Sequence, residues 1–251
     1  MTSRAHGTTP PGAASEEQAA RWVRGMFGRV AHRYDLLNHL LSFQIDRYWR
    51  ARTVRRVRDV LARPDARVMD LCCGTGDLLL ALHACGSGSD GLLLGSDFCH
   101  PMLLGARQKV ERRGARAPLF EADALQLPLR DGSLDLVTVA FGFRNFANYR
   151  KGLVELLRVL RPGGVAAILE FSQPPNRLFA GAYGFYSRQV LPRLGGLISG
   201  SKDAYTYLPE SVRKFPGAEA LAEEMREVGF EDVRFERMTF GVVALHLGVR
   251  R

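Results

Sequence analysis

The sequence is poor in cysteine and lysine and has no long apolar run. Four cysteines in 251 residues are too few for a disulfide-stabilised scaffold, and none belongs to a C-x-x-C pair of the zinc-binding kind. No apolar run approaches the ~20 residues that a membrane-spanning helix requires, which argues against an integral membrane protein. Residues 1–20 lack the apolar segment of a secretory signal, so we expect a cytoplasmic location, and we predict no metal site.

Basic residues are in excess, and arginine supplies nearly all of them. Lys and Arg together number 35 against 26 Asp and Glu, giving a net charge of +9, and only four are lysines. The excess is concentrated between residues 21 and 67, where twelve arginines face four aspartates. Such a region could be an ordinary solvated surface, a contact with an anionic membrane, or a nucleic-acid surface. No nucleic-acid-binding motif accompanies the charge, so we expect no nucleic-acid partner.

Residues 45–61 predict an amphipathic helix within this basic region. Its arginines can lie on one side while its apolar residues share the other, namely Ile45, Tyr48, Trp49, Val54, Val57, Val60 and Leu61. The helix is therefore the element that would carry a peripheral membrane contact at the inner face of the membrane, if one exists.

The chain reads as a tail followed by one α/β domain. Residues 1–20 mix Pro, Gly, Ser and Thr without periodicity and predict a disordered tail, and the domain spans 21–251 with helices over 21–63. Short apolar runs then alternate with helical stretches, which favours a parallel sheet covered on both faces. The expected strands are 67–72, 91–96, 117–121, 134–140 and 164–171, and the expected helices are 77–85, 100–113 and 150–160.

The alternation stops after the fifth expected strand. Residues 174–213 are rich in aromatics, Gly and Pro and predict an inserted helical segment. A helix at 217–228 follows, and the runs 232–238 and 241–249 predict an antiparallel pair at the sheet edge.

A glycine-rich turn follows the first expected strand. Gly74, Thr75 and Gly76 form it, and Asp70 precedes Gly74 by four residues. Such a turn lets a ligand approach the backbone and presents helix N–H groups to it. The dinucleotide fingerprint requires a third glycine where Leu79 stands, so D-x-x-x-G-x-G favours S-adenosylmethionine (SAM) over a nicotinamide dinucleotide.

Acidic residues also end the next two expected strands. Asp97 is placed to accept the hydroxyls of a ribose, and Asp123 with Ala124 is placed to bind an adenine amino group. Each acid taken singly could instead cap a helix or a turn. Together with the glycine-rich turn, they predict a SAM site.

Longer motifs surround this site. They are YDLLN at 34–38 continuing to Trp49, FGFRN at 141–145, RVLRPGG at 158–164 continuing to Ser172, and GVVALH at 241–246. With them the sequence resembles the UbiE/MenG quinone C-methyltransferase family from about Met26 to the C-terminus. The family usually has Met at Leu37, Gly at Gln44 and His at Asp46, and Ala140 stands where a SAM-contacting Ser is common.

The resemblance implies a class I SAM-dependent methyltransferase fold, a Rossmann-like mixed sheet of seven strands whose last strand is antiparallel. It adds Ala140 to the SAM-binding residues. It implies methylation of a ring carbon on a prenylated naphthoquinol, converting demethylmenaquinol to menaquinol, with a benzoquinol as the related alternative. A homodimer is compatible with it. A non-catalytic scaffold is disfavoured by the intact acidic and glycine motifs, and a nucleic-acid methyltransferase by FGFR at 141–144, where a base-flipping motif would stand.

The chemistry of the reaction places further demands on the site. A quinone ring is too electron-poor to attack the SAM methyl, so the substrate must be the reduced quinol, and its phenolic proton must leave. We expect Arg144 to stabilise the resulting phenolate, Asn145 to orient the substrate oxygen and Tyr34 to lie over the cofactor. We expect His246 to be structural. An apolar entrance for the prenyl tail is predicted around Phe179, Tyr183, Phe185 and Tyr186.

Overall fold

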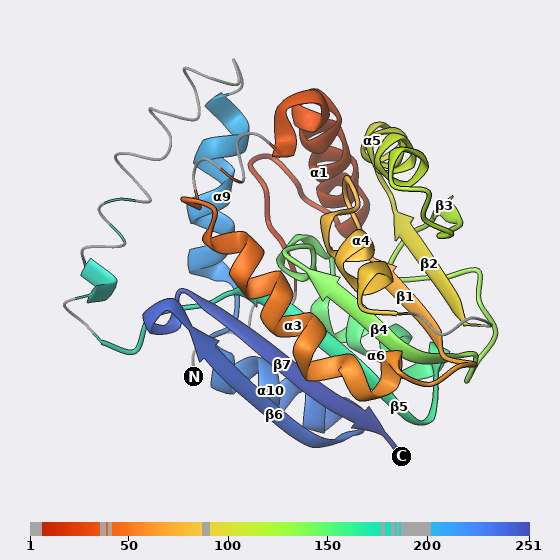
Figure 1. Ribbon diagram of the computed structural model, residues 1–251. Coiled ribbons are helices and arrows are strands. Elements are labelled where there is room, and N and C mark those ends of the chain that lie inside the picture. Colours follow the sequence, from red (N-terminus) through yellow and green to blue (C-terminus); the bar gives the residue numbers. More distant parts are fainter. Residues whose placement is uncertain are drawn as a thin grey trace.

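A seven-stranded sheet forms the centre of the computed structural model (Figure 1), which describes residues 7–35, 39, 42–86, 91–176, 179–181, 184, 186 and 202–251. The strand order is β3-β2-β1-β4-β5-β7-β6. The five strands from β3 to β5 are parallel, whereas β7 is antiparallel to both β5 and β6. Their bounds are β1 Arg67–Leu71, β2 Leu92–Asp97, β3 Leu119–Glu121, β4 Leu134–Ala140, β5 Leu160–Phe171, β6 Phe230–Met238 and β7 Val243–Arg250.

The sheet confirms the predicted strands and the antiparallel addition. The third strand is shorter than expected, and β5 begins at Leu160, four residues before its predicted start. The last two strands do pair antiparallel, but β7 lies inside the sheet and only β6 forms the edge. This arrangement buries β7, because it has a hydrogen-bonded neighbour on each side.

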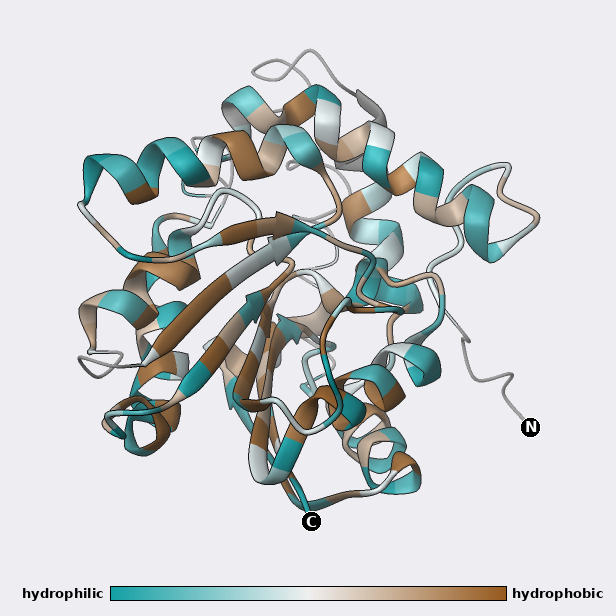
Figure 2. Cartoon of the chain, turned by 90° about the vertical axis from the view of Figure 1, so that its right-hand side faces the viewer, coloured by the Kyte–Doolittle hydropathy of each residue, from teal (hydrophilic) through white to brown (hydrophobic). Residues whose placement is uncertain are grey.

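Helices cover both faces of the sheet. Side chains of α3 Ile45–Leu61, α4 Asp77–Ala84 and α5 His100–Arg112 pack on one face. Those of α6 Tyr149–Val159 and α10 Ala218–Val228 pack on the other. Successive strand residues such as Val68 and Met69 enter opposite clusters, which explains why the central strands carry apolar residues on both faces. Figure 2 shows this apolar interior between helices with polar outer faces.

Regular structure begins closer to the N-terminus than predicted. Helix α1 runs over Glu16–Val30, followed by the short helix η1 Ala31–Arg33, so a disordered tail reaching residue 20 is wrong. Ser15 caps α1 by accepting from the Gln18 N–H, and Gln18 Oε1 accepts from the Ala14 N–H. This reciprocal arrangement resembles a capping box, a local signal that composition alone conceals. Thr8 is also buried, and its N–H donates to the Phe146 carbonyl at 2.8 Å. Residues 1–6 lie outside the described residues.

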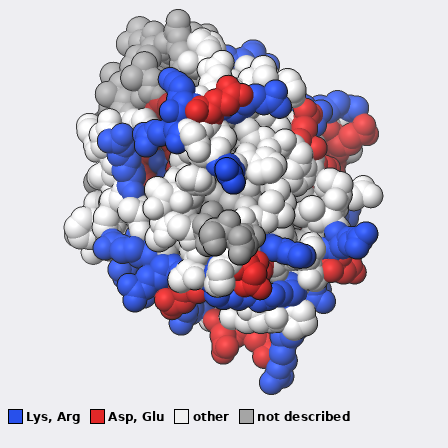
Figure 3. Space-filling model, turned by 45° about the vertical axis from the view of Figure 1, so that its right-hand side comes forward, with Lys and Arg blue, Asp and Glu red and all other residues white. Residues whose placement is uncertain are grey.

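Helix α3 has the predicted bounds, but its apolar side is narrower than expected. Trp49, Val54, Val57 and Leu61 are buried, whereas Ile45 and Tyr48 are exposed. Arg52 and Arg56 both pair with Glu236 of β6, and Arg50 pairs with Asp46. Basic and acidic side chains are likewise interspersed on the face in Figure 3. Half of the six arginines of α3 therefore act within the fold.

The predicted insertion is described in part. Helix α9 Lys202–Lys214 lies within it, while residues 187–201, and with them most of the aromatic and glycine-rich stretch, lie outside the described residues. Tyr183 and Phe185 also lie outside them. Within the described ranges, no helix combines the length and the apolar character needed to span a bilayer.

Candidate functional site

A cavity of about 330 Å³ opens at the carboxyl ends of the parallel strands. Residues after β1, β2, β3 and β4 line it, and helix α1 contributes the opposite wall through Glu16, Glu17 and Ala20. Strands β2 and β3 lie on one side of β1, and β4 lies on the other. The strand order thus reverses between β1 and β4, which is where open α/β sheets bind their ligands.

The glycine-rich turn after β1 is held in an unusual backbone conformation. Gly74 has φ 55°, a left-handed value that glycine adopts without strain, and the Tyr34 ring lies over it. In the loop after β4, the strand that neighbours β1 in the sheet, a Cβ at Gly142 would fall 2.4 Å from Cys72 Cβ. Gly142 therefore allows the loops after β1 and β4 to approach closely at the cavity.

Asp97 ends β2 and holds the glycine-rich turn in place. Its Oδ2 accepts from the Gly74 N–H at 2.9 Å, and its Oδ1 accepts from the Cys99 N–H at 2.9 Å. Burial raises the pKa of Asp97 to about 6, although these N–H donors oppose the shift. The carboxylate lines the cavity and keeps lone pairs beyond the two that the backbone uses.

Seven of the predicted site residues line the cavity. They are Tyr34, Gly74, Asp97, Asp123, Ala124, Ala140 and Asn145. Asp123 is exposed at the rim after β3, where its Oδ1 accepts from the Leu125 N–H at 2.9 Å. The cavity therefore has one end over β2 and β3 with Asp97 and Asp123, and another over β1 and β4 with Tyr34 and Asn145.

Asp70, Thr75, Gly76 and Arg144 were predicted for the site but do not line the cavity. Asp70 lies inside β1, where its Oδ1 accepts from the Thr138 hydroxyl at 2.7 Å and its Oδ2 has no partner among the described residues. Burial raises the pKa of Asp70 to about 7. Thr75 donates to Asp35 instead, and Gly76 caps the start of α4 in a left-handed conformation. Direct cofactor contacts by these residues stay predictions.

Arg144 forms a buried ion pair behind the cavity wall. Its Nη1 lies 3.0 Å from Glu170 Oε1 and donates to the Phe141 carbonyl at 2.5 Å. Burial lowers the pKa of Arg144, but the attraction of Glu170 outweighs it and holds that pKa above its usual value. Sequence reasoning missed Glu170 as the partner because Arg144 lies in the short helix after β4 and Glu170 lies in β5, 26 residues away.

Asn145 belongs to a hydrogen-bond chain that sequence reasoning did not find. Its Oδ1 accepts from the Tyr207 hydroxyl at 3.0 Å, and that hydroxyl lies 2.6 Å from Thr8 Oγ1. Tyr207 belongs to α9, so the chain joins the N-terminal segment, the loop after β4 and the helix that follows the insertion. The Tyr207 hydroxyl thereby fixes the amide orientation of Asn145, a residue that lines the cavity.

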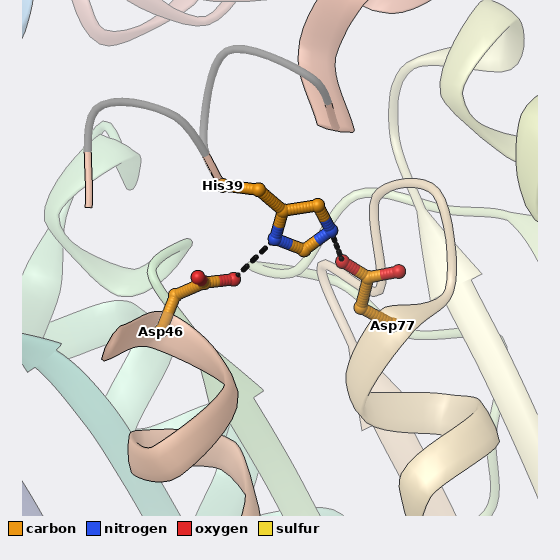
Figure 4. Close-up of side chains that lie close together, drawn as sticks. All are labelled: His39, Asp46 and Asp77. Carbon is orange, nitrogen blue, oxygen red and sulfur yellow. Dashed lines mark hydrogen bonds and ion pairs between the residues drawn. The ribbon is translucent and has the colours of Figure 1, made fainter. Parts of the chain in front are cut away.

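A charged cluster fastens the N-terminal region to the glycine-rich turn (Figure 4). His39 Nδ1 lies 2.8 Å from Asp46 Oδ2, and its Nε2 lies 3.5 Å from Asp77 Oδ2. Burial raises the pKa of Asp77, but Arg50 and Lys109 outweigh it and hold that pKa below its usual value. Arg50 pairs with Asp46 and Lys109 pairs with Asp77, so each carboxylate in Figure 4 has a cationic partner. The three residues in Figure 4 therefore belong to an ion-pair network.

Lys109 is the centre of this charged cluster. Its Nζ lies 2.6 Å from Asp35 Oδ2 and 2.6 Å from Asp77 Oδ1. Asp35 adjoins Tyr34 of the cavity wall, and Asp77 begins α4 directly after the glycine-rich turn. The Lys109 ammonium thus links the segment that carries Tyr34 to the start of α4 at this end of the cavity.

We expect Lys109→Met to weaken ligand binding in the cavity about fivefold, since losing a half-buried ion pair costs about 1 kcal/mol and frees the Tyr34 segment. Titration calorimetry with the cofactor proposed below measures this. Arg107→Met changes an exposed cation on the same helix and is the matched control. Equal affinities for the Lys109 variant and the native protein would contradict the expectation.

His246 lies away from the cavity, as expected for a structural residue. It is buried in β7, and its Nε2 lies 2.8 Å from the Ala218 carbonyl at the start of α10. Burial lowers the pKa of His246 to about 4, so the ring is neutral near pH 7. It joins the antiparallel strands to the helix that covers them.

The cavity is acidic although the protein is basic. Its lining residues include four carboxylates and no lysine or arginine among the described residues. Glu16 pairs with Lys151 and Glu17 pairs with Arg21, so Asp97 and Asp123 are the lining carboxylates for which the described residues provide no ion pair. A cationic ligand is favoured in such a cavity, whereas the phosphates of a nicotinamide dinucleotide would be repelled.

The chain matches the model of the ubiE/COQ5 methyltransferase family over residues 13–250. It is 52% identical to the demethylmenaquinone methyltransferase of Thermus thermophilus, over 90% of this chain and 100% of that protein. It is 44% identical to the protein of the same name from Deinococcus radiodurans, over 96% and 98% of the two chains. It is 39% identical to the ubiquinone/menaquinone biosynthesis C-methyltransferase UbiE of Shewanella pealeana, over 93% and 92%.

Solved structures share the fold at low sequence identity. A SAM-dependent methyltransferase from Aquifex aeolicus matches with a TM-score of 0.58 and 18% identity, over 79% of this chain and 89% of that one. A possible histamine N-methyltransferase from Thermotoga maritima matches with a TM-score of 0.63 and 18% identity, over 90% and 99%. The fold is the Rossmann-like one of class I methyltransferases.

Proposed function

The chain belongs to the ubiE/COQ5 methyltransferase family, and from this we propose that it methylates a ring carbon of a prenylated naphthoquinol, converting demethylmenaquinol to menaquinol with SAM as methyl donor. The acidic cavity at the switch point of the sheet carries the proposal, because it suits a cationic cofactor. The names of the curated relatives support the quinone substrate.

The residues present fit SAM. Asp97 lines the cavity with free lone pairs for ribose hydroxyls, and Asp123 with Ala124 can hold the adenine at the end over β3. The glycine-rich turn at Gly74 and the small side chain of Ala140 leave room for the methionine part. Two buried carboxyls with raised pKa values, Asp70 and Asp97, are also groups that a nearby cation would stabilise in the ionised form.

When bound, SAM supplies an electrophilic methyl group on its sulfonium. The hydroquinone form of the substrate is the nucleophile, because loss of a phenolic proton raises the electron density on the ring carbon. With SAM bound, that carbon would accept the methyl group, and the sulfur–methyl bond would break in the same step. The ring then loses its own hydrogen as a proton, and the product phenol is reprotonated, so one proton is released overall.

The protein must hold the ring carbon ~3–3.5 Å from the methyl group and align it with the breaking bond. Tyr34 and Asn145 line the end of the cavity over β1 and β4, where this contact would occur. Asn145, fixed by Tyr207, can orient the substrate oxygen, and the Tyr34 hydroxyl can share the phenolic proton of that oxygen. Arg144 acts as a positioning residue, since it holds the Phe141 carbonyl and favours nearby negative charge from behind the wall.

The prenyl tail gives the substrate a membrane location. We therefore propose that the protein collects it at the inner face of a membrane through a peripheral contact. Of the predicted apolar entrance, Phe179 and Tyr186 are described; they are partly buried, pack against the core clusters and do not line the cavity, so the entrance stays a prediction. A homodimer stays a prediction.

The test incubates the protein with SAM and a demethylmenaquinone analogue, with and without dithionite, followed by mass spectrometry. We expect a mass gain of one CH₂ in the quinol only under reducing conditions. A parallel reaction with a demethylated benzoquinol distinguishes the two substrate classes. Cofactor binding by calorimetry without any methylation of either quinol would overturn the proposal and favour a scaffold.

A further inference from the structure

Exposed apolar side chains gather at one place on the described surface. Phe43, Ile45 and Tyr48 stand exposed at the N-terminal end of α3, and Phe240 stands exposed in the turn between β6 and β7. Phe43 and Phe240 are the two most exposed large apolar residues described, at 71% and 78%. We call these four residues the aromatic rim.

The two parts of the aromatic rim meet in space. Trp49 of α3 donates from Nε1 to Thr239 Oγ1 at 2.8 Å, and Thr239 adjoins Phe240. In Figure 1 the start of α3 and the β6–β7 turn both lie at the left side of the molecule. The rim is therefore one surface built from two distant segments of the chain.

The backbone at the rim adopts conformations that side chains disfavour. Phe43 and Gln44 have φ values of 52° and 64°, and Thr239 and Phe240 have values of 50° and 55°. Non-glycine residues rarely adopt left-handed backbone, and such strain concentrates at functional sites. Here it holds two phenylalanine rings in the solvent.

Aromatic residues continue from the rim to the cavity. The Phe240 ring lies 5.0 Å from Phe179, which packs against the same core cluster as Trp49. The Trp49 ring lies 5.8 Å from Phe141, whose side chain lines the cavity. The rim is thus the outer end of an apolar region that reaches the candidate methyl-transfer site.

The charge beside the rim is basic. Arg47 is exposed between Ile45 and Tyr48, and Arg55 is exposed further along α3, whereas Arg50, Arg52 and Arg56 pair with carboxylates within the fold. Exposed aromatic rings flanked by arginine are typical of surfaces that insert into the headgroup region of anionic bilayers. A hydrophobic protein partner would not require these cations.

We propose that the aromatic rim docks the protein on an anionic phospholipid surface, with Phe43 and Phe240 entering the headgroup region. Docking there places the aromatic path to Phe141 next to the bilayer, so that a lipid-borne substrate can enter without crossing water. This assignment rests on the proposed function in one respect, namely that the substrate is held in the membrane.

The test uses the double variant Phe43→Asn/Phe240→Asn, because asparagine tolerates left-handed backbone and removes the ring. Sedimentation with vesicles of phosphatidylglycerol and phosphatidylcholine measures binding. We expect the vesicle-bound to free ratio to fall at least about tenfold relative to the native protein. The matched control is Leu104→Asn/Val154→Asn, which changes two other exposed apolar residues, on α5 and α6, and should bind as the native protein does.

Two substrates separate docking from catalysis. The Phe43/Phe240 variant should methylate a short-tailed, water-soluble quinol at the native rate and lose activity toward a long-tailed quinol held in vesicles. Native-like sedimentation of this variant would overturn the docking assignment, as would equal loss in the control. Vesicle binding that depends on the rim, in a protein that methylates neither quinol, would support docking while the proposed function fails.

Discussion

Replacing Asp97 with alanine should lower the affinity for SAM by about a hundredfold to a thousandfold. The carboxylate holds both the Gly74 and Cys99 N–H groups, and each hydrogen bond to a charged group contributes about 1.5–3 kcal/mol. The substitution removes these bonds together with the acceptors for ribose. Titration calorimetry measures the loss, and circular dichroism establishes that the variant is folded.

The pH dependence of the affinity for SAM tests the role of Asp97 independently. Its pKa of about 6 in the free protein means that the carboxyl is protonated below that value and loses acceptor capacity. Cofactor affinity should therefore fall as the pH drops through 6, and Asp97→Asn, already weakened, should lack this step. Glu121→Gln removes a nearby carboxylate that does not line the cavity but helps to raise the pKa of Asp97, so it should retain the native affinity above pH 7 and move the step to a lower pH. An unchanged pH profile in Asp97→Asn would show that another group is responsible.

Removing the charge of Glu170 should destabilise the protein by about 3–5 kcal/mol, because it leaves the buried Arg144 guanidinium without a counter-ion. Glu170 also accepts from the N–H groups of Arg144 and Phe171, at 3.1 and 2.8 Å, so Glu170→Gln satisfies only part of this network. Urea unfolding measures the free energy. Glu223→Gln breaks an exposed ion pair with Arg226 and should cost under about 1 kcal/mol.

The double variant Arg144→Met/Glu170→Leu separates stability from function. Removing both charges together should recover most of the stability, since no uncompensated charge stays buried. The turnover number should stay low while the cofactor affinity is native, because the Phe141 carbonyl at the cavity is no longer held by Arg144. Recovery of turnover together with stability would assign the pair a purely structural role.

The local sequence alone determined the position of the strands, of helix α3 and of the glycine-rich turn. Buried strands such as 134–140 are apolar on both faces, so their position follows from composition without tertiary information. Helix α3 has the bounds that its periodicity predicts, and Gly74 marks a turn that only glycine forms easily. Asp97 and Asp123 both line the cavity, because the carboxyl ends of parallel strands lie at the same edge of the sheet.

Side-chain direction and pairing between distant segments were decided only by the tertiary structure. Whether Arg144 faces the cavity depends on Glu170, 26 residues away, which draws the guanidinium behind the wall. Thr8, Asn145 and Tyr207 meet although Thr8 and Tyr207 lie 199 residues apart. Thr75, a neighbour of Gly74, turns to Asp35 and Lys109. Periodicity and motifs report on residues close in sequence, whereas these contacts form only when the sheet brings separate loops to one edge.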